Sequence, residues 1–525
     1  MFQYLRRLAT TGAAYTASSI ISKLVAVFLL PVYTSYLSPS DYGAAEVMLA
    51  SVIAVSIAIR LGVIEGILRF YYLTDESAET VVATGFASLF WTATIAAGIA
   101  LIFATPISQA LLGHEDAGLA RLAILGLWTL TLWEYALTLL RLDERARAYF
   151  TITVVNVALT IPVTVWLVVV ERLGADAILL GTFGTGAVVL VWRLWQERRR
   201  LSFVPDRPLL RRMLRFGFPT MPAELSLYSL NFIDRIVLVR FAGLAEAGLY
   251  ALAIKFANAM QVLSRGFQLA FPPLAYSIVD DEEARRAYAL ILTWFVAVLA
   301  FAVTGLWLLA PWLVRALSTP EYFAAHEAVG LLATGIALYA VYLVLLIILG
   351  RTRRTELNFP ATAAGTVANV GLNIALVPPL GIVGAGLALV ASYVVVLVLM
   401  YAFTQRLFPV AYEWRRLLLV VGLAVAVVGG AEAFVPQSGI AALAVRTVLW
   451  LAYPLALLGA GFLTAEERDR LREMLRPSAV RARLSALRAA SATDTTAEAG
   501  TGGAGPRLTP EAYEEAFRDD DRAGT

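Results

Sequence analysis

The chain has 525 residues, of which 59% are hydrophobic and only 15% are charged, and it contains no cysteine. About a quarter of the residues of an ordinary globular domain are charged, so this composition excludes a soluble protein and indicates a polytopic membrane protein. Without cysteine, a disulfide framework, a thiolate metal site and a cysteine nucleophile are also excluded. The net charge of +3 adds little.

Fourteen apolar stretches are long enough to cross a bilayer, which takes about 20 residues. The first ends without a small-residue cleavage site and is too long for the core of a signal peptide, so we expect it to be retained as a helix. The sequence therefore predicts an all-α membrane protein. In chain order, the stretches cover 12–36, 44–69, 81–105, 118–140, 150–170, 175–195, 216–240, 246–272, 286–314, 326–350, 356–378, 381–404, 414–434 and 440–463.

The sequence repeats itself at an offset of 205 residues, which places Gly43 on Gly248 and Arg60 on Arg265. Further along, Asn156 aligns with Asn369 at an offset of 213, because one loop is longer in the second copy. Six predicted helices separate each feature from its copy. An even number means that both halves run in the same sense and are related by an axis along the membrane normal. Transporters build a substrate path at such a repeat interface.

The predicted organisation follows from this repeat and from changes in composition. Beyond the repeat, Thr464-x-x-Glu467 forms a capping box before an arginine-rich amphipathic stretch, and the last residues have a disordered composition. The expected parts are an N-terminal six-helix lobe (1–195), a cytoplasmic loop between lobes (196–215), a C-terminal six-helix lobe (216–404), two extra helices (414–463), a cytoplasmic amphipathic helix (464–490) and a disordered tail (491–525).

Arginine placement predicts the orientation of the helices. With a cytoplasmic N-terminus, the inside segments carry nineteen arginines, whereas the outside segments carry Arg172 and Arg315. Positively charged loops stay on the cytoplasmic side, so we expect both termini there. The arginine-rich 196–215 loop is accounted for by this topology and by attraction to anionic lipid headgroups.

The lysines stand out among the charges inside predicted helices. Lys23 and Lys255 are the only two lysines, against forty arginines, and both lie in apolar stretches. A buried lysine can lose its proton whereas arginine cannot, so these residues are candidates for substrate binding with a change of charge. The alternative is a structural salt bridge, for which Asp234 lies at a depth similar to that of Lys255.

Arg60 and Arg265 are related by the repeat, and each shares one helix face with polar residues within an arc of about 80°. Two such stripes facing each other would line a hydrated cavity. Guanidinium groups bind phosphate bidentately, so the predicted ligand is a diphosphate headgroup. The alternative is that both arginines reach to the inner membrane surface. The stripe around Arg265 contains Asn258, Gln261 and Gln268, and that around Arg60 contains Glu46 and Ser56.

Acidic residues at membrane depth can bind H⁺ or Na⁺ and so couple transport to an ion gradient. They can equally neutralise Lys23, Arg60, Arg69 or Arg141. Glu134 and Arg141 share a helix face and are candidates for one charge network. The full set of such acids is Glu46, Glu65, Glu134, Glu224 and Asp234.

Motifs for cofactors and catalysis are missing from the sequence. His114-Glu115 and His326-Glu327 lack the second histidine of a zinc helix, and no phosphate-binding loop or nucleophile elbow occurs. No loop between helices exceeds about twenty residues, which leaves no room for a soluble catalytic domain. We therefore expect no enzyme activity, no metal or cofactor, and no binding of nucleic acid.

The segment LLPVYTSYLSPSDYG, from Leu29 to Gly43, resembles the first helix and turn of the Wzx-type flippases. These are the bacterial polysaccharide transporters of the MOP (multidrug/oligosaccharidyl-lipid/polysaccharide) superfamily. The resemblance covers about residues 1–463. Further matches are Leu214-Arg215-Phe216-Gly217-Phe218-Pro219, Asp234-Arg235 and Ala247-Gly248-Leu249-Tyr250-Ala251.

This resemblance implies a MATE-like fold, with a V-shaped pair of six-helix lobes and two extra helices. The implied activity is alternating access that moves an undecaprenyl-diphosphate-linked oligosaccharide to the outer leaflet of the bacterial inner membrane. The glycan would be a repeat unit of O-antigen (lipopolysaccharide), exopolysaccharide or capsule. Implied partners are membrane lipids, H⁺ or Na⁺ as coupling ion, and polysaccharide polymerase or export machinery.

Other functions stay open at this stage. A lipid II flippase would share the cationic cavity and the fourteen helices. A cation-coupled multidrug antiporter of the MATE type would favour carboxylates over arginines in its cavity, since its substrates are usually cations. A membrane-embedded polymerase or ligase would need a sizeable outside loop, which the sequence lacks.

Overall fold

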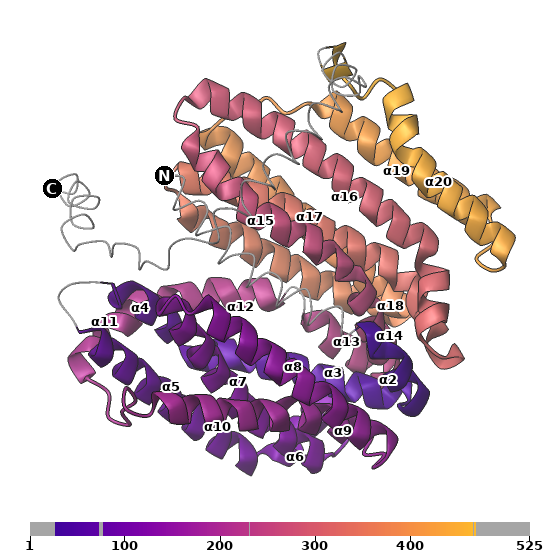
Figure 1. Cartoon of the computed structure of the whole chain (residues 1–525). Coiled ribbons are helices and arrows are strands. Elements are labelled where there is room, and N and C mark those ends of the chain that lie inside the picture. The colour runs from indigo at the N-terminus through magenta and orange to yellow at the C-terminus, as the bar shows by residue number, and fades with distance from the viewer. Residues whose placement is uncertain (1–26, 73–76, 230–231, 466, 469–525) are drawn as a thin grey trace, which may run out of the picture. The chain divides into compact units, whose positions relative to one another are not determined.

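The computed structural model describes residues 27–72, 77–229, 232–465 and 467–468, and within them it contains helices and no strands (Figure 1). This confirms the all-α prediction. Ten helices in the described part are long and apolar enough to cross a membrane. The described residues up to Pro454 belong to one compact unit and those from Leu455 on to a second. The predicted count of fourteen, the domain boundaries and the V shape stay predictions.

The N-terminal half, as we call α2 to α10, contains the first copy of the repeat. A basic helix, α11 (Arg207–Gly217), follows it within and just after the predicted loop between lobes. The elements of the half are α2 (Leu30–Tyr36), α3 (Pro39–Arg60), α4 (Val63–Phe70), α5 (Ala78–Ile102), α6 (Ala104–Leu112), α7 (Ala117–Leu142), α8 (Ala146–Val169), α9 (Ala175–Leu179), a π-helical turn (Leu180–Gly184) and α10 (Thr185–Glu197).

The C-terminal half, as we call α12 to α18, contains the second copy, and a hairpin of α19 (Trp414–Phe434) and α20 (Ile440–Gly459) follows it. Short 3₁₀ turns occupy Phe218–Thr220, Pro320–Ala325 and Thr355–Leu357. The helices of this half are α12 (Met221–Ser229), α13 (Ile233–Ala242), α14 (Leu244–Ala257), α15 (Ala259–Ser277), α16 (Asp281–Leu317), α17 (His326–Arg351) and α18 (Asn358–Leu407).

The most specific part of the sequence motif is a helix start. Ser38 caps α3, its hydroxyl accepting from the Asp41 amide at 3.2 Å, while the Asp41 carboxylate accepts from the Ser38 amide at 3.3 Å. Pro39 takes the first helical position, where its missing N–H costs nothing. Ser-Pro-x-Asp therefore fixes where α3 begins. The capping box at Thr464 and Glu467 also forms, but the amphipathic helix and tail expected after it lie outside the described residues.

Two stretches predicted as single helices are interrupted. The 44–69 stretch breaks at Leu61 and Gly62, both left-handed, with φ of 51° and 72°. At Gly62 a Cβ would lie 2.1 Å from the carbonyl carbon of Gly217, so only glycine fits there. The 246–272 stretch breaks at Asn258 into α14 and α15. The 356–378 and 381–404 stretches, by contrast, are two helices as predicted; they share the label α18 and are separated at Gly381, whose backbone is non-helical, with φ of 53° and ψ of −131°.

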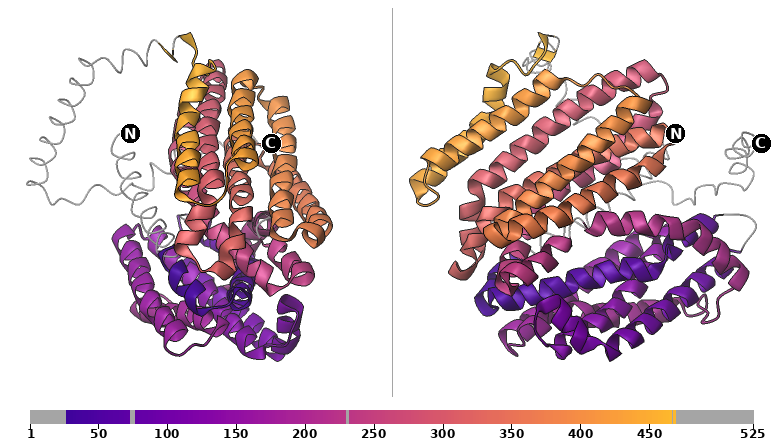
Figure 2. Two further views of the ribbon diagram at one scale, coloured as in Figure 1. Left: turned by 90° about the vertical axis from the view of Figure 1, so that its right-hand side faces the viewer. Right: turned by 180° about the vertical axis from the view of Figure 1, so that it is seen from behind.

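The hairpin of α19 and α20 is attached to α16, beside which α19 lies in Figures 1 and 2. The Trp450 indole occupies the position where a Cβ of Gly305 would be, 2.6 Å away, and its N–H donates to the Phe301 carbonyl at 2.9 Å. Arg446, fully buried in α20, donates to Glu432 at 2.7 Å and to the Val435 carbonyl at 2.8 Å. These contacts pair the two terminal nitrogens of the buried guanidinium with the end of α19, while its Nε has no hydrogen-bond partner.

A further link joins the hairpin turn to the start of α17. Gln437 donates to Glu432 at 2.7 Å, and its amide oxygen lies 2.9 Å from Nε2 of His326. Arg315, at the end of α16, donates to the Gln437 carbonyl. The hairpin is thus held to the C-terminal half both along α16 and at the turn.

An ion-pair cluster joins the ends of α4, α7 and α10. The Asp143 carboxylate accepts from Arg200 at 2.7 and 3.2 Å and from the Tyr71 hydroxyl at 2.8 Å. Glu197 pairs with Arg193 at 2.7 Å. Burial disfavours ionisation of Asp143, but the hydrogen bonds from Arg200 and Tyr71 outweigh it, so its pKa lies below the usual value.

Acid should therefore weaken this cluster. A carboxyl whose pKa is lowered by folding stabilises the protein above its ordinary pKa, about 3.9, and loses that contribution as the pH falls through the lowered value. We expect Asp143→Asn to cost about 1 kcal/mol at pH 7, because the cluster is only partly shielded, and the difference to shrink below about pH 4. Melting curves from pH 3 to 7 measure this. Glu171→Gln, on an exposed turn, is the control; parallel pH profiles for Asp143→Asn and the unaltered protein would contradict it.

Candidate functional site

The two halves meet along α3, which packs against α12 and α14; we call these contacts the α3 seam. Near the start of the seam, two glycines bring the backbones together. A Cβ on Gly43 would lie 2.1 Å from the Leu244 carbonyl oxygen, and one on Gly248 would lie 2.0 Å from that of Pro39. The offset of 205 relates both pairs, Gly43 to Gly248 and Pro39 to Leu244. The repeat axis therefore runs through this glycine crossing.

Polar contacts follow the glycine crossing along α3. Glu46, buried, pairs with Lys255 of α14 at 2.8 Å, and Arg235 of α13 is close enough to add to the positive charge around that carboxylate. Next, the Tyr228 hydroxyl donates to the Ala50 carbonyl at 3.1 Å. At the end of α3, Arg60 pairs with Glu224 of α12 at 3.2 Å. The seam thus combines one tight backbone contact with two ion pairs between the halves.

The two arginines that the repeat relates, Arg60 and Arg265, lie in different positions on their helices. Arg60 is the last residue of α3, because the helix breaks at Leu61, and its Nε donates to the Ser56 carbonyl at 3.2 Å. A single helix over the predicted 44–69 stretch would place Arg60 in its interior, whereas in the structure Arg60 lies at a helix end. Arg265 lies in α15 and donates to Gln268 of its own helix at 3.4 Å. Lys23 lies outside the described residues.

Two hydrogen bonds join neighbouring residues of the polar stripe that was predicted around Arg265. Gln261 donates to the Asn258 side chain at 2.9 Å, as Arg265 does to Gln268. Asn258, however, ends α14 rather than lying within one continuous helix, so Lys255 and Arg265 belong to different helices. On the other stripe, Ser56 is buried, with 2% of its surface exposed.

Of the predicted acidic residues, Glu46 and Glu224 form the two ion pairs of the seam, and the others have different surroundings. The expected pairing of Lys255 with Asp234 is wrong, because α14 turns Lys255 toward α3 and Glu46 instead. Asp234 accepts from the Tyr250 hydroxyl. Glu65, in the first turn of α4, and Glu134, in α7, are partly buried. Arg141 donates to Thr138 at 2.7 Å, so its expected network with Glu134 stays a prediction.

Several fully buried polar atoms of the C-terminal half have no hydrogen-bond partner, and three of them lie on α13 and α18. These three are Oδ1 of Asp234, Nδ2 of Asn369 and Oδ1 of Asn373. Asp234 lies on α13, which packs against α18, the helix that carries both asparagines. Unpaired buried oxygens are costly and are suited to a hard cation or a proton. Within the described residues, no three His, Asp or Glu side chains gather as metal ligands.

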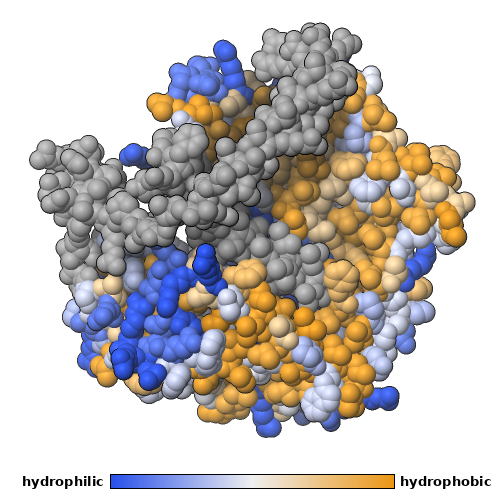
Figure 3. Space-filling model, in the orientation of Figure 1, coloured by the Kyte–Doolittle hydropathy of each residue, from blue (hydrophilic) through white to orange (hydrophobic). Residues whose placement is uncertain are grey.

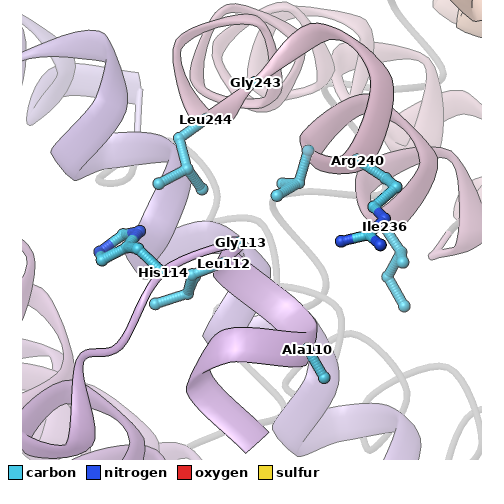
Figure 4. Close-up of a pocket in the computed structure, with 9 residues that line it drawn as sticks. Ala110, Leu112, Gly113, His114, Ile236, Arg240, Gly243 and Leu244 are labelled. Carbon is cyan, nitrogen blue, oxygen red and sulfur yellow. The ribbon is translucent and has the colours of Figure 1, made fainter. Parts of the chain in front are cut away.

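A cavity of about 360 Å³ lies beside the glycine crossing (Figure 4). Arg240 and His114 line it from the two halves, together with Gly113, Gly243 and Leu244. Both basic side chains are exposed. Leu244 also takes part in the crossing, so this cavity would change shape whenever the halves separate there.

Sequence reasoning missed several residues of the seam. Gly43 and Gly248 were visible as repeat partners, but glycine pairing alone does not show which backbone approaches them. Arg235 follows Asp234 in the family-like segment, but nothing in the sequence indicates that it approaches Glu46. Tyr228 carried no sequence signal at all.

Comparison with known proteins defines the class. A lipid II flippase, MurJ, in an inward closed conformation superposes with a TM-score of 0.70 at 11% identity, covering 87% of this chain and 99% of that one. An inward-facing multidrug resistance MATE family transporter of the MOP superfamily superposes with a TM-score of 0.61 at 16% identity, covering 74% and 98%. The chain is a multi-pass membrane protein with the fold of the MOP-superfamily transporters.

Sequence comparison then gives the family. The model of the family described as polysaccharide biosynthesis protein matches residues 34–327, and the chain belongs to that family. It is also 29% identical over 324 residues to the succinoglycan biosynthesis transport protein ExoT of Rhizobium meliloti (strain 1021). That match spans 58% of this chain and 61% of the relative.

Proposed function

We propose that the protein is a flippase, which moves an undecaprenyl-diphosphate-linked oligosaccharide from the cytoplasmic to the outer leaflet of the bacterial inner membrane. Membership of the polysaccharide biosynthesis family supports this substrate class, as does the name of the succinoglycan transport relative. The fold supports a transport role rather than an enzymatic one. Both termini would be cytoplasmic, where polymerase or export proteins are further candidate partners.

The observation that carries the mechanism is the α3 seam. Its glycine crossing holds the halves in backbone contact, and alternating access requires this contact to open and close. Arg60 and Lys255 lie on the seam and Arg265 lies on the helix after Lys255, so a diphosphate entering between the halves would compete with Glu224 and Glu46 for cationic partners. Substrate binding would then weaken the ion pairs that hold the halves together.

Coupling to H⁺ or Na⁺ is proposed at Asp234. Its buried Oδ1 has no hydrogen-bond partner, and α18 supplies the unpaired Oδ1 of Asn373. Glu46, Glu65 and Glu134 are the other candidates for the charge network. A multidrug antiporter remains the competing function, and it would depend on these acids more than on the arginines.

The first test is leaflet translocation in proteoliposomes, with a fluorescent undecaprenyl-diphosphate oligosaccharide and an impermeant quencher. We expect the unaltered protein to translocate this lipid. Arg60→Ala with Arg265→Ala should slow translocation at least about tenfold, since each charged hydrogen bond to phosphate is worth about 1.5 to 3 kcal/mol. Arg172→Ala, on an exposed turn of the N-terminal half, is the matched control.

A cationic dye serves as competing substrate in the same vesicles. Dye transport without lipid translocation would reject the flippase and favour the antiporter. Lipid translocation at the normal rate by the double variant would keep the flippase but reject the arginines as the diphosphate site.

A further inference from the structure

A second cavity, of about 320 Å³, lies in the N-terminal half, between α5 and the end of α10. Phe86 and Phe90 of α5, Trp195 of α10 and Phe203 of the following loop form its apolar walls. The Phe203 ring lies 5.7 Å from that of Phe86 and 5.0 Å from that of Phe90. The Trp91 indole fixes this loop by donating to the Phe203 carbonyl at 2.8 Å. The cavity is therefore built on two helices and a pinned loop.

One charged side chain lines this cavity. The Arg198 guanidinium lies over the Trp195 ring, 4.5 Å from its centroid, and donates to the Trp195 carbonyl at 2.9 Å. The remaining guanidinium N–H groups have no acceptor among the described contacts. Arg200, by contrast, forms an ion pair with Asp143. Arg198 is thus positioned by an aromatic ring and its own backbone, with donors left for a ligand.

The surroundings of the cavity change from apolar to basic along α10. Its exposed side chains Val188, Val191 and Trp192 are 66%, 59% and 48% accessible, which suits contact with acyl chains. Beyond its end, α11 buries Leu209 and Met213 while its arginines are exposed. Figure 3 shows the same change, with a hydrophobic flank over α8 and α10 and hydrophilic residues at the end where α11 lies. The cavity lies at this boundary.

We propose that this cavity binds one anionic phospholipid of the surrounding leaflet. An acyl chain would lie in the trough between the contacting rings of Phe86, Phe90 and Phe203 on one side and Val191 of α10 on the other, and the phosphate would accept from Arg198. A free phosphate would gain nothing from the apolar walls. A zwitterionic lipid would bring its own positive charge next to the guanidinium, so an anionic headgroup is the better match. A bound lipid would brace the loop that leads into α11.

Native mass spectrometry of the full chain in detergent tests this, by titration with phosphatidylglycerol and with phosphatidylcholine of the same acyl chains. We expect one tight site for phosphatidylglycerol that is at least about tenfold weaker for phosphatidylcholine. Arg198→Ala should weaken that site to the same extent. Arg147→Ala, which removes an exposed arginine from the start of α8, should leave it unchanged.

A second variant, Val191→Trp, keeps Arg198 but fills the trough, and it should also remove the tight site. Equal affinity of Arg198→Ala and the unaltered protein for phosphatidylglycerol would overturn the proposal. So would displacement by glycerol 3-phosphate, which indicates a soluble phosphate, or stronger binding of undecaprenyl phosphate, which indicates the carrier lipid. Because the measurement is of binding alone, its result is separate from that of the translocation assay.

Discussion

Gly43→Ala and Gly248→Ala should each reduce translocation by up to about 100-fold without unfolding the protein. Either methyl group would lie about 2 Å from a carbonyl oxygen of the opposite helix, and backbone cannot move aside as a flexible side chain can. Overpacking of this kind typically costs about 1 to 3 kcal/mol, which is about 5- to 150-fold in the equilibrium between closed and separated halves. Translocation in proteoliposomes gives the functional loss.

The structural cause can be measured directly, because the chain has no cysteine. Ser40→Cys and Ala245→Cys are exposed repeat partners beside the crossing, and spin labels there report the separation of α3 and α14. Either alanine variant should lengthen that distance. Gly98→Ala is the control, since no atom lies within 4 Å of its added Cβ. A lengthened label distance together with normal transport would show that the crossing does not need to close, and an unchanged distance would show that the added methyl group does not separate the helices.

Breaking the ion pair between Glu46 and Lys255 should have the second largest effect. Removing one partner of a buried pair costs about 3 to 5 kcal/mol, because the other charge remains buried. Lys255 is 27% exposed, so we expect the lower end for Glu46→Gln and a loss of about 100-fold in the population of the closed seam. The same spin-label pair measures this population.

The double variant Glu46→Gln with Lys255→Met distinguishes a structural pair from a binding site. With both charges gone, closure should recover, whereas translocation should stay low if Lys255 also meets the diphosphate. A double-mutant cycle gives the coupling energy between the two residues. If the single variants close normally and their effects add, the pair has no part in holding the seam.

Much of the architecture could be predicted, because short sequence patterns indicate it. The hydrophobic stretches mark the helices, Ser38 and Asp41 mark the start of α3, and the repeat places Gly43 on Gly248. The helix break at Leu61 could not be predicted, since leucine normally avoids a positive φ and the close approach of Gly217 to the neighbouring Gly62 joins residues that are far apart in the chain. That break changes the position of Arg60 from helix interior to helix end.

The partner of Lys255 could not be predicted from the sequence either. Lys255 and Glu46 are about two hundred residues apart, and their meeting depends on how far α3 and α14 slide past each other. Asp234 is closer in the chain and lies at a similar predicted depth, so depth alone favours it as the ion-pair partner of Lys255. Register between the halves is set by the glycine crossing, so a correct prediction of the ion pair requires first knowing where two backbones touch.

The attachment of α19 and α20 has a consequence for how the molecule moves. Trp450 packs against Gly305 of α16, and the contact between Gln437 and His326 joins the hairpin turn to the C-terminal half. If the α3 seam opens as proposed, the hairpin would therefore move together with the C-terminal half. The C-terminal half together with the hairpin would then be a larger moving body than the N-terminal half.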